Sequence, residues 1–173
     1  MTQSRLLALQ STVMAITTTL GRAVAWLTVV LVLVTFTVVL LRYGFQWSHM
    51  ALQEAIVYLH CIVFLLALAW TADADQHVRV DIFYRRFTVR QKAWINCLGS
   101  LVFLLPFSLF LLWVTWPFFQ SAWAIKEASG EAGGLPWVYW LKGLLPLAAA
   151  SLVMQAIGQV LGNLGRLLAE VEA

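Results

Sequence analysis

The side chains that carry chemistry in other proteins are few and widely spaced in this sequence. His60 lies inside an apolar stretch, and Glu54 stands at the edge of the same stretch. A haem between membrane helices needs facing histidines, and a carrier of ions or protons usually needs an ionisable group deep in the membrane. Neither arrangement occurs in this sequence. We therefore expect no cofactor, no metal and no catalytic residue.

The two cysteines are also unsuited to redox chemistry. Cys61 is expected near one face of the membrane and Cys97 near the other, so the bilayer separates them. A disulfide needs Cα atoms within about 7 Å of each other. We expect both to be small packing residues. Since no phosphate-binding glycine loop, zinc spacing or nucleophile–base motif occurs either, the chain is not expected to be an enzyme.

Four stretches without any charged residue are the elements that must position the candidate residues. They cover residues 23–41, 55–72, 93–125 and 143–165. An ionised side chain at the bilayer centre costs about 2.5–3.5 kcal/mol, and about 20 apolar residues span the hydrocarbon core. The expected fold is a single all-α integral membrane domain with four transmembrane helices, at 23–43, 54–72, 94–116 and 143–165.

The basic residues predict the orientation. The break at 73–92 holds five of them, and cytoplasmic loops are enriched in Lys and Arg. Segment 73–92 is therefore expected to be a cytoplasmic loop, with both termini cytoplasmic and 117–142 a periplasmic loop. The net charge of +3 is too small and dispersed to indicate nucleic-acid binding.

Residues 1–21 are expected to form an amphipathic helix at the membrane surface. An apolar stripe with spacings of three and four residues runs through Leu6, Leu9, Val13, Ile16 and Leu20. Gly21 and Arg22 are expected to mark a turn into the first span.

The third stretch is too long for one crossing. Pro106 is expected to kink it and Pro117 to end or bend it, with 118–125 continuing as an external segment. Small residues suited to close helix packing occur on the third and fourth spans, and internal and intersubunit packing both remain open. They are Gly99, Ser100, Ser108, Gly143, residues 148–151, Gly158 and Gly162.

Function should then reside in the charged breaks. Arg42 and Glu54 flank a short turn and are of opposite sign, so an ion pair between them is expected. A second group follows the second span, at 76–81 (QHVRVD). A third lies around the last break: Ser121, Trp123, Glu127, Ser129, Gly134, Leu135, Pro136, Trp137 and Lys142.

These residues, in this order, resemble a known family. The pattern is Arg42, Tyr43, Trp47, Glu54, HVRVD at 77–81, Ser121, Glu127, Ser129, GLP at 134–136, Lys142, Pro146 and Gln155. It is similar to the small membrane subunit (DctQ type) of tripartite ATP-independent periplasmic (TRAP) transporters, over about residues 22–165.

The resemblance implies an accessory scaffold subunit of the bacterial inner membrane. A large membrane subunit would carry an organic acid, commonly a carboxylate, together with sodium, and a periplasmic binding protein would deliver the acid. The candidate docking residues for the binding protein are Arg42, Lys126, Glu127, Glu131 and Lys142. Candidates for cytoplasmic anchoring to phospholipid or to the large subunit are His77, Arg79, Asp81, Arg85 and Arg86, and Trp47, Glu54, Gly134 and Pro136 are expected to be structural.

Two other classes of function remain as alternatives. A self-contained small exporter would need an essential acidic residue in the membrane, for which Glu54 is the candidate. A membrane redox subunit would need haem or quinone ligands on facing helices. Transport by the purified chain alone would indicate the first, and a visible absorption spectrum would indicate a haem.

Overall fold

The computed structural model describes residues 2–73, 84 and 86–172, and every regular element in these residues is a helix. The elements are α1 (Thr2–Gly44), α2 (Met50–Asp73), α4 (Val89–Gly99), the π-helix η1 (Ser100–Leu104), α5 (Leu105–Ala124) and α6 (Val138–Glu172). Four segments are long and apolar enough to cross a membrane: Thr18–Gly44, Met50–Leu68, Val89–Ala124 and Val138–Leu168. The prediction of a four-helix membrane protein is confirmed in this respect.

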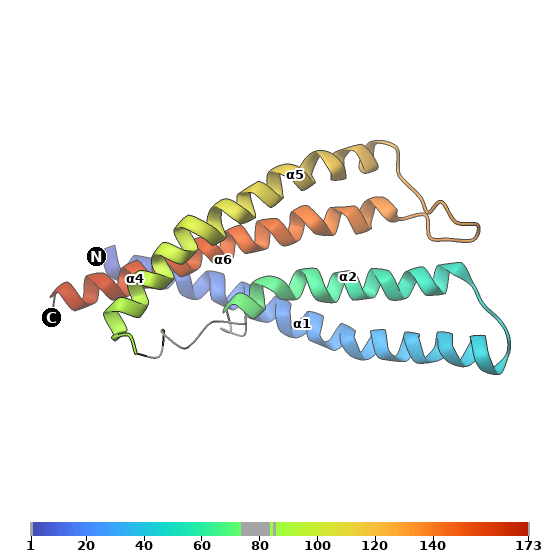
Figure 1. The fold of residues 1–173 in the computed structure, drawn as a ribbon, viewed down its shortest axis with the longest axis horizontal. Coiled ribbons are helices and arrows are strands. Elements are labelled where there is room, and N and C mark those ends of the chain that lie inside the picture. The colour runs from blue at the N-terminus through green and yellow to red at the C-terminus, as the bar shows by residue number, and fades with distance from the viewer. Residues whose placement is uncertain (1, 74–83, 85, 173) are drawn as a thin grey trace.

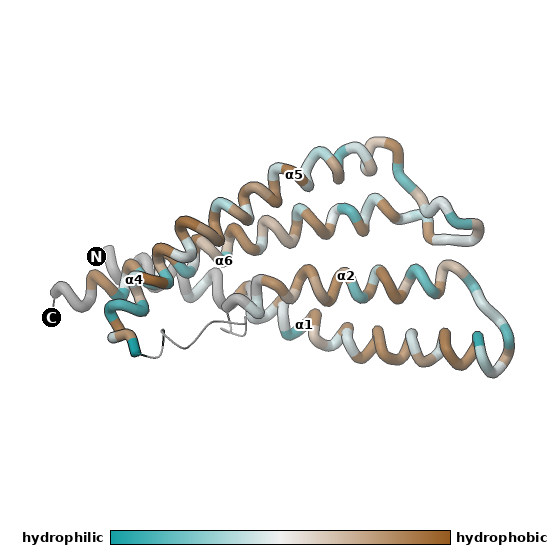
Figure 2. The backbone as a smooth tube through the Cα atoms, viewed as in Figure 1, coloured by the Kyte–Doolittle hydropathy of each residue, from teal (hydrophilic) through white to brown (hydrophobic). Residues whose placement is uncertain are grey.

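The helices form an elongated layer (Figure 1). Near the α1–α2 turn and the α5–α6 loop, which together we call the loop end, they lie side by side in the order α5, α6, α2, α1. The first described turn of α1 and the last of α6 lie at the opposite, terminal end. Figure 2 shows apolar residues along the middle of the helices and hydrophilic residues in the α5–α6 loop and at the start of α4. This partition suits a chain whose middle lies in lipid.

Helix α1 crosses the layer obliquely, because it contacts α6 as well as its hairpin partner α2. The less exposed positions of its second half alternate at spacings of three and four residues: 24, 27, 31, 34, 38 and 41. This is the spacing of a helix–helix seam. Nearly every residue in this part of α1 is apolar, so hydrophobicity does not distinguish the residues that face other helices. Their positions follow from how α1 packs against its neighbours.

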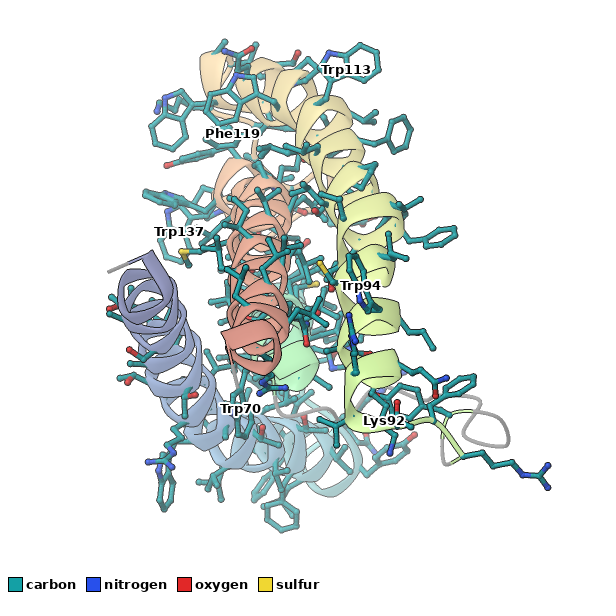
Figure 3. The ribbon with its side chains drawn as sticks, turned by 90° about the vertical axis from the view of Figure 1, so that its left-hand side faces the viewer. Trp70, Lys92, Trp94, Trp113, Phe119 and Trp137 are labelled. Atoms are coloured by element: carbon teal, nitrogen blue, oxygen red, sulfur yellow. The ribbon has the colours of Figure 1, made fainter. Side chains whose placement is uncertain are left out.

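The turn predicted at Gly21 and Arg22 is wrong, because α1 runs without interruption from Thr2 to Gly44. Gly21 instead provides room for a neighbour. A Cβ atom at this position would lie 2.6 Å from Cβ of Trp70 and still closer to its Cγ, so α1 and α2 touch at this point (Figure 3). The glycine therefore permits a close approach of two helices within a continuous element.

The third span changes its helical winding before Pro106. Helix α4 begins with a capping box in which Thr88 and Gln91 exchange hydrogen bonds between side chain and backbone. In η1 the hydrogen bonds reach five residues back, and the Leu105 N–H donates to the Ser100 carbonyl. The expected irregularity near Pro106 is thus a π-helical turn.

Of the two outcomes predicted for Pro117, an end or a bend of the third stretch, the end is wrong. Helix α5 continues through Pro117 to Ala124. Prolines are tolerated inside membrane helices because small local adjustments satisfy the backbone groups that the ring leaves without a partner. The segment 118–125, predicted to continue beyond the crossing as an interfacial or short external helix, is helical as far as Ala124, where α5 ends.

Helix α6 is the central element, with contacts to α1, α2, α4, η1 and α5. Its small residues face these neighbours: Ala148, Ala149 and Ala156 are at most 3% exposed, and Gly158 and Gly162 are buried. Ser100 and Ser108 on the third span are buried as well. Most of the small residues noted in the sequence therefore serve internal packing, and the surface left to lipid or a partner is made of larger apolar side chains.

Candidate functional site

The loop end contains the most extensive polar arrangement among the described residues. Its key side chain is Glu54, in the second turn of α2. Oε2 of Glu54 accepts a hydrogen bond of 2.6 Å from the Leu135 N–H, and Oε1 accepts one from the Ser129 hydroxyl. Both donors lie in the α5–α6 loop, residues 125–137. One carboxylate thus links the α1–α2 hairpin to the loop of the other hairpin.

The loop closes on itself around Ser129. The Ser129 Oγ accepts from the Glu131 N–H (3.1 Å), the Ser129 N–H donates to the Leu135 carbonyl (3.0 Å), and the Gly134 N–H donates to the Glu131 carbonyl (3.0 Å). Gly133 has a φ of +76°, a left-handed conformation that favours glycine. Residues 129–135 therefore form a compact turn with its own backbone bonds.

Only glycine fits at position 134, because there is no space for a Cβ atom. A Cβ atom there would lie 2.6 Å from Cβ of Ser129 and 2.8 Å from Oε1 of Glu54, closer than real Cβ contacts allow. At Gly130, in the same loop, an added Cβ would have no heavy atom within 4 Å. Gly134 is therefore packed against Glu54 and Ser129, whereas Gly130 is not.

Two of the candidate docking residues, Glu127 and Lys142, are paired with each other. Lys142 Nζ lies 2.6 Å from a Glu127 carboxylate oxygen, with only 23% and 30% of the respective side chains exposed. The same Nζ stands 4.2 Å from the centre of the Phe118 ring. This pair fastens the base of the loop to α6 and leaves little of either charge at the surface.

The other three docking candidates are exposed. Lys126, at a positive φ of 49°, holds its Nζ 3.5 Å from the Trp123 ring centre and 5.0 Å from that of Tyr139. Glu131 projects from the compact turn, and Arg42 stands at the end of α1 with its guanidinium 6.0 Å from the Tyr43 ring. Figure 1 places the ends of α1 and α5 at opposite edges of the layer, so the charges of Arg42 and Lys126 lie far apart.

The predicted Arg42–Glu54 ion pair is wrong. Both residues are described, and no ion pair joins them, because the two carboxylate oxygens of Glu54 accept from Ser129 and Leu135 instead. Trp47 and Pro136 are exposed, and the Trp47 ring stacks on His49 at 5.8 Å between centres.

Only one of the anchoring candidates is among the described residues: Arg86, which is exposed in a turn before α4. His77, Arg79, Asp81 and Arg85 lie outside the described residues. Nearby, the Asn96 amide donates to the Tyr84 hydroxyl at 2.9 Å, and Lys92 Nζ stands 5.3 Å from the Tyr84 ring centre. The cations Arg86, Arg90 and Lys92 thus cluster around the first turn of α4.

Polar groups within the spans bond mainly to their own helix. The hydroxyls of Thr35, Thr37, Ser108, Thr115 and Ser151 donate to carbonyls three or four residues earlier. Ser100 instead donates to Gln159 Oε1 across the η1–α6 contact (2.8 Å). His60 is exposed and stacks on Phe64, and Cys61 and Cys97 are free thiols. Within the described ranges, no three His, Cys, Asp or Glu side chains converge on a possible metal site.

Sequence reasoning named Glu54, Ser129, Gly134 and Leu135 but did not connect them. Glu54 is separated by 75 and 81 residues from its donors. One of these donors is a backbone N–H, which every residue except proline has, so the residue type does not reveal it. The available signals were an acidic residue at a span edge and, elsewhere in the sequence, a loop with one serine and three glycines.

Comparison with known proteins gives one result that bears on identity. Residues 31–166 match the model of the family "Tripartite ATP-independent periplasmic transporters, DctQ component". No curated protein and no solved structure matches the chain. The matched region covers most of the sequence and includes about half of the first span, the second and third spans, nearly all of the fourth, and the whole loop end. The chain therefore belongs to the DctQ family, the small membrane components of TRAP transporters.

Proposed function

We propose that this chain is the non-transporting scaffold subunit of a sodium-coupled importer of an organic acid, commonly a carboxylate. It pairs in the bacterial inner membrane with a large membrane subunit, which carries the acid and the sodium. Its loop end faces the periplasm and forms part of the surface on which the substrate-binding protein docks.

The observation that carries this proposal is the use of polar groups inside the spans. A carrier needs polar or ionisable side chains that line a path for its substrate. In the described spans the hydroxyls of Thr35, Ser108 and Thr115 are bonded to their own helices, and Ser100 and Gln159 bond to each other. The buried Tyr58 hydroxyl, one turn from Glu54, has no partner among the described residues. Glu54, at the edge of the second span, is held by loop donors. Such a bundle suits support of another protein better than transport.

Charge supports the orientation and a lipid contact. The basic residues Arg86, Arg90 and Lys92 gather at the start of α4, at the terminal end. Each basic residue near an anionic cytoplasmic leaflet contributes about 1 kcal/mol of attraction. With the terminal end in the cytoplasm, these side chains reach phospholipid headgroups.

The docking candidates divide into two groups. Arg42, Lys126 and Glu131 are exposed and available to a partner, whereas Glu127 and Lys142 stabilise the loop through their mutual ion pair. We propose that the first group contacts the binding protein directly and that the second acts through the shape of the loop.

Co-purification tests the pairing. The chain is expressed with the products of adjacent reading frames, extracted in mild detergent or nanodiscs, and examined for a large membrane protein that elutes with it. Uptake of a radiolabelled carboxylate into proteoliposomes, with and without a sodium gradient, then tests the coupling. A large subunit that transports equally well without this chain would contradict the proposal.

Charge reversal tests the docking surface. Lys126→Glu should raise the concentration of binding protein that gives half-maximal uptake, while the complex with the large subunit stays intact. Lys126→Gln serves as a control that removes the charge without reversing it, and it should have a smaller effect. Unchanged dependence on binding protein in both variants would remove Lys126 from the docking surface.

A further inference from the structure

We infer that Glu54 is a positioning residue for docking: its hydrogen bonds to Ser129 and Leu135 form a latch that holds the α5–α6 loop in the shape the substrate-binding protein recognises. This inference rests on the proposed docking function. It assigns to Glu54 a role in partner recognition through the loop, with no contact to the partner itself.

The latch is built from two charge-assisted hydrogen bonds to one carboxylate. The Leu135 N–H donates to Oε2 at 2.6 Å, and the Ser129 hydroxyl donates to Oε1. Bonds with one ionised partner are about twice as strong as neutral ones. Ser129 passes the constraint on, since its Oγ also accepts from the Glu131 N–H at 3.1 Å. A helix residue thus determines the orientation of the turn that displays Glu131.

The exposed face of the turn carries few side chains. Gly130 and Gly133 are exposed and have none, Ala128 and Ala132 are small, and Glu131 supplies the charge. Such a surface presents mainly backbone, so its recognition depends on the conformation of the backbone. A loop of this composition has high conformational entropy when it is not tied down. The latch therefore matters more here than it would in a loop with bulky anchors of its own.

A close contact between hairpins supports the same assignment. A Cβ atom at Gly133 would lie 3.9 Å from Cε1 of His49, which belongs to the α1–α2 turn. The turn formed by 129–135 is thus bounded by Glu54 beneath it and His49 beside it, both from the other hairpin. Opening the latch would separate the loop from this neighbour as well.

Two of the three loop glycines give a matched test. Gly134→Ala places a methyl group against Ser129 and Glu54 and should open the latch, whereas Gly130→Ala meets open space. Each variant is purified in complex with the large subunit and reconstituted in proteoliposomes. Two quantities are measured: amide hydrogen exchange over residues 128–136, and carboxylate uptake as a function of binding-protein concentration.

With Gly134→Ala, we expect exchange over 128–136 to accelerate by about tenfold or more, the factor that corresponds to loss of one charge-assisted bond. The concentration of binding protein for half-maximal uptake should rise, while uptake at saturating binding protein stays near that of the unmodified complex. Glu54→Gln keeps one acceptor oxygen and should give an intermediate result. Gly130→Ala adds the same methyl group where it meets no atom of the loop, so it should leave the exchange rates over 128–136 unchanged.

The outcomes separate this inference from the proposed function. If the unmodified complex takes up substrate only with this chain present, but Gly134→Ala responds to binding protein in the same way as the unmodified complex, the positioning role of Glu54 is overturned and the subunit assignment stands. The positioning role is also overturned if Gly134→Ala exchanges its loop amides faster but the dependence of uptake on binding-protein concentration does not change. If uptake does not require this chain at all, the proposed function fails first, and the exchange data then report on the latch alone.

Discussion

Gly21→Ala gives the most direct test of how the first helix packs. In the structure α1 is continuous, and Gly21 faces Trp70 of α2 so closely that a Cβ atom would lie 2.6 Å from Cβ of Trp70 and nearer still to its Cγ. Rotation of the Trp70 side chain can move Cγ, but it leaves Cβ in place. The added methyl group must therefore push the two helices apart or shift Trp70.

The expected change in the free energy of unfolding follows from two opposing terms. Replacing glycine by alanine inside a helix stabilises it by about 1 kcal/mol. Overpacking a close contact costs about 1–3 kcal/mol. Gly99→Ala provides the reference, because an added Cβ there has no heavy atom within 4 Å and only the stabilising term applies. We expect Gly21→Ala to be less stable than Gly99→Ala by about 1–3 kcal/mol, the overpacking term.

The assay is unfolding of the purified chain in mixed micelles, followed by tryptophan fluorescence and repeated by a thermal scan in nanodiscs. A double variant, Gly21→Ala with Trp70→Ala, should show coupling, since removal of the ring relieves part of the clash. Equal stability of Gly21→Ala and Gly99→Ala would refute the packing of α1 against Trp70. It would instead favour a turn at Gly21 and a separate surface helix.

Two further substitutions test local features of the same structure. Thr88→Ala removes the hydroxyl that accepts from the Gln91 N–H at the start of α4, so residues 89–92 should lose about 1 kcal/mol of local stability and exchange their amides faster, with Thr88→Ser as the control. Lys142→Met leaves the half-buried Glu127 without its cation. A double-mutant cycle with Glu127→Gln should give a coupling above the about 0–1 kcal/mol of exposed pairs, and a coupling near zero would contradict a structural role for the pair.

The membrane class could be predicted from sequence because the bilayer imposes a strong and simple constraint. Charged residues are excluded from four stretches, and helices alone satisfy the backbone within such stretches. The start of the third helix also has a local signal, since Thr88 and Gln91 stand at the spacing of a capping box. Features of this kind depend on composition or on neighbours a few residues apart.

The partners of individual residues could not be predicted in the same way. Glycine is compatible with a turn, with a bend or with close packing, and at Gly21 only the position of Trp70 on another helix decides between them. Pro117 is likewise compatible with an end or with continuation of α5. Arg42 was a reasonable partner for Glu54 by charge, but the Leu135 N–H and the Ser129 hydroxyl occupy the carboxylate. Tertiary geometry decided each of these cases.

Glu54 also bears on the alternative in which the chain transports by itself. An acidic residue that carries protons or ions must exchange them, so its oxygens must be accessible to the transported species during the cycle. Here both oxygens accept bonds from the α5–α6 loop, and Gly134 packs so closely that an added Cβ atom would lie 2.8 Å from Oε1. Releasing the carboxylate would require breaking both bonds at every cycle. A charge at the edge of a span is therefore better explained as a support for the loop than as part of a transport path.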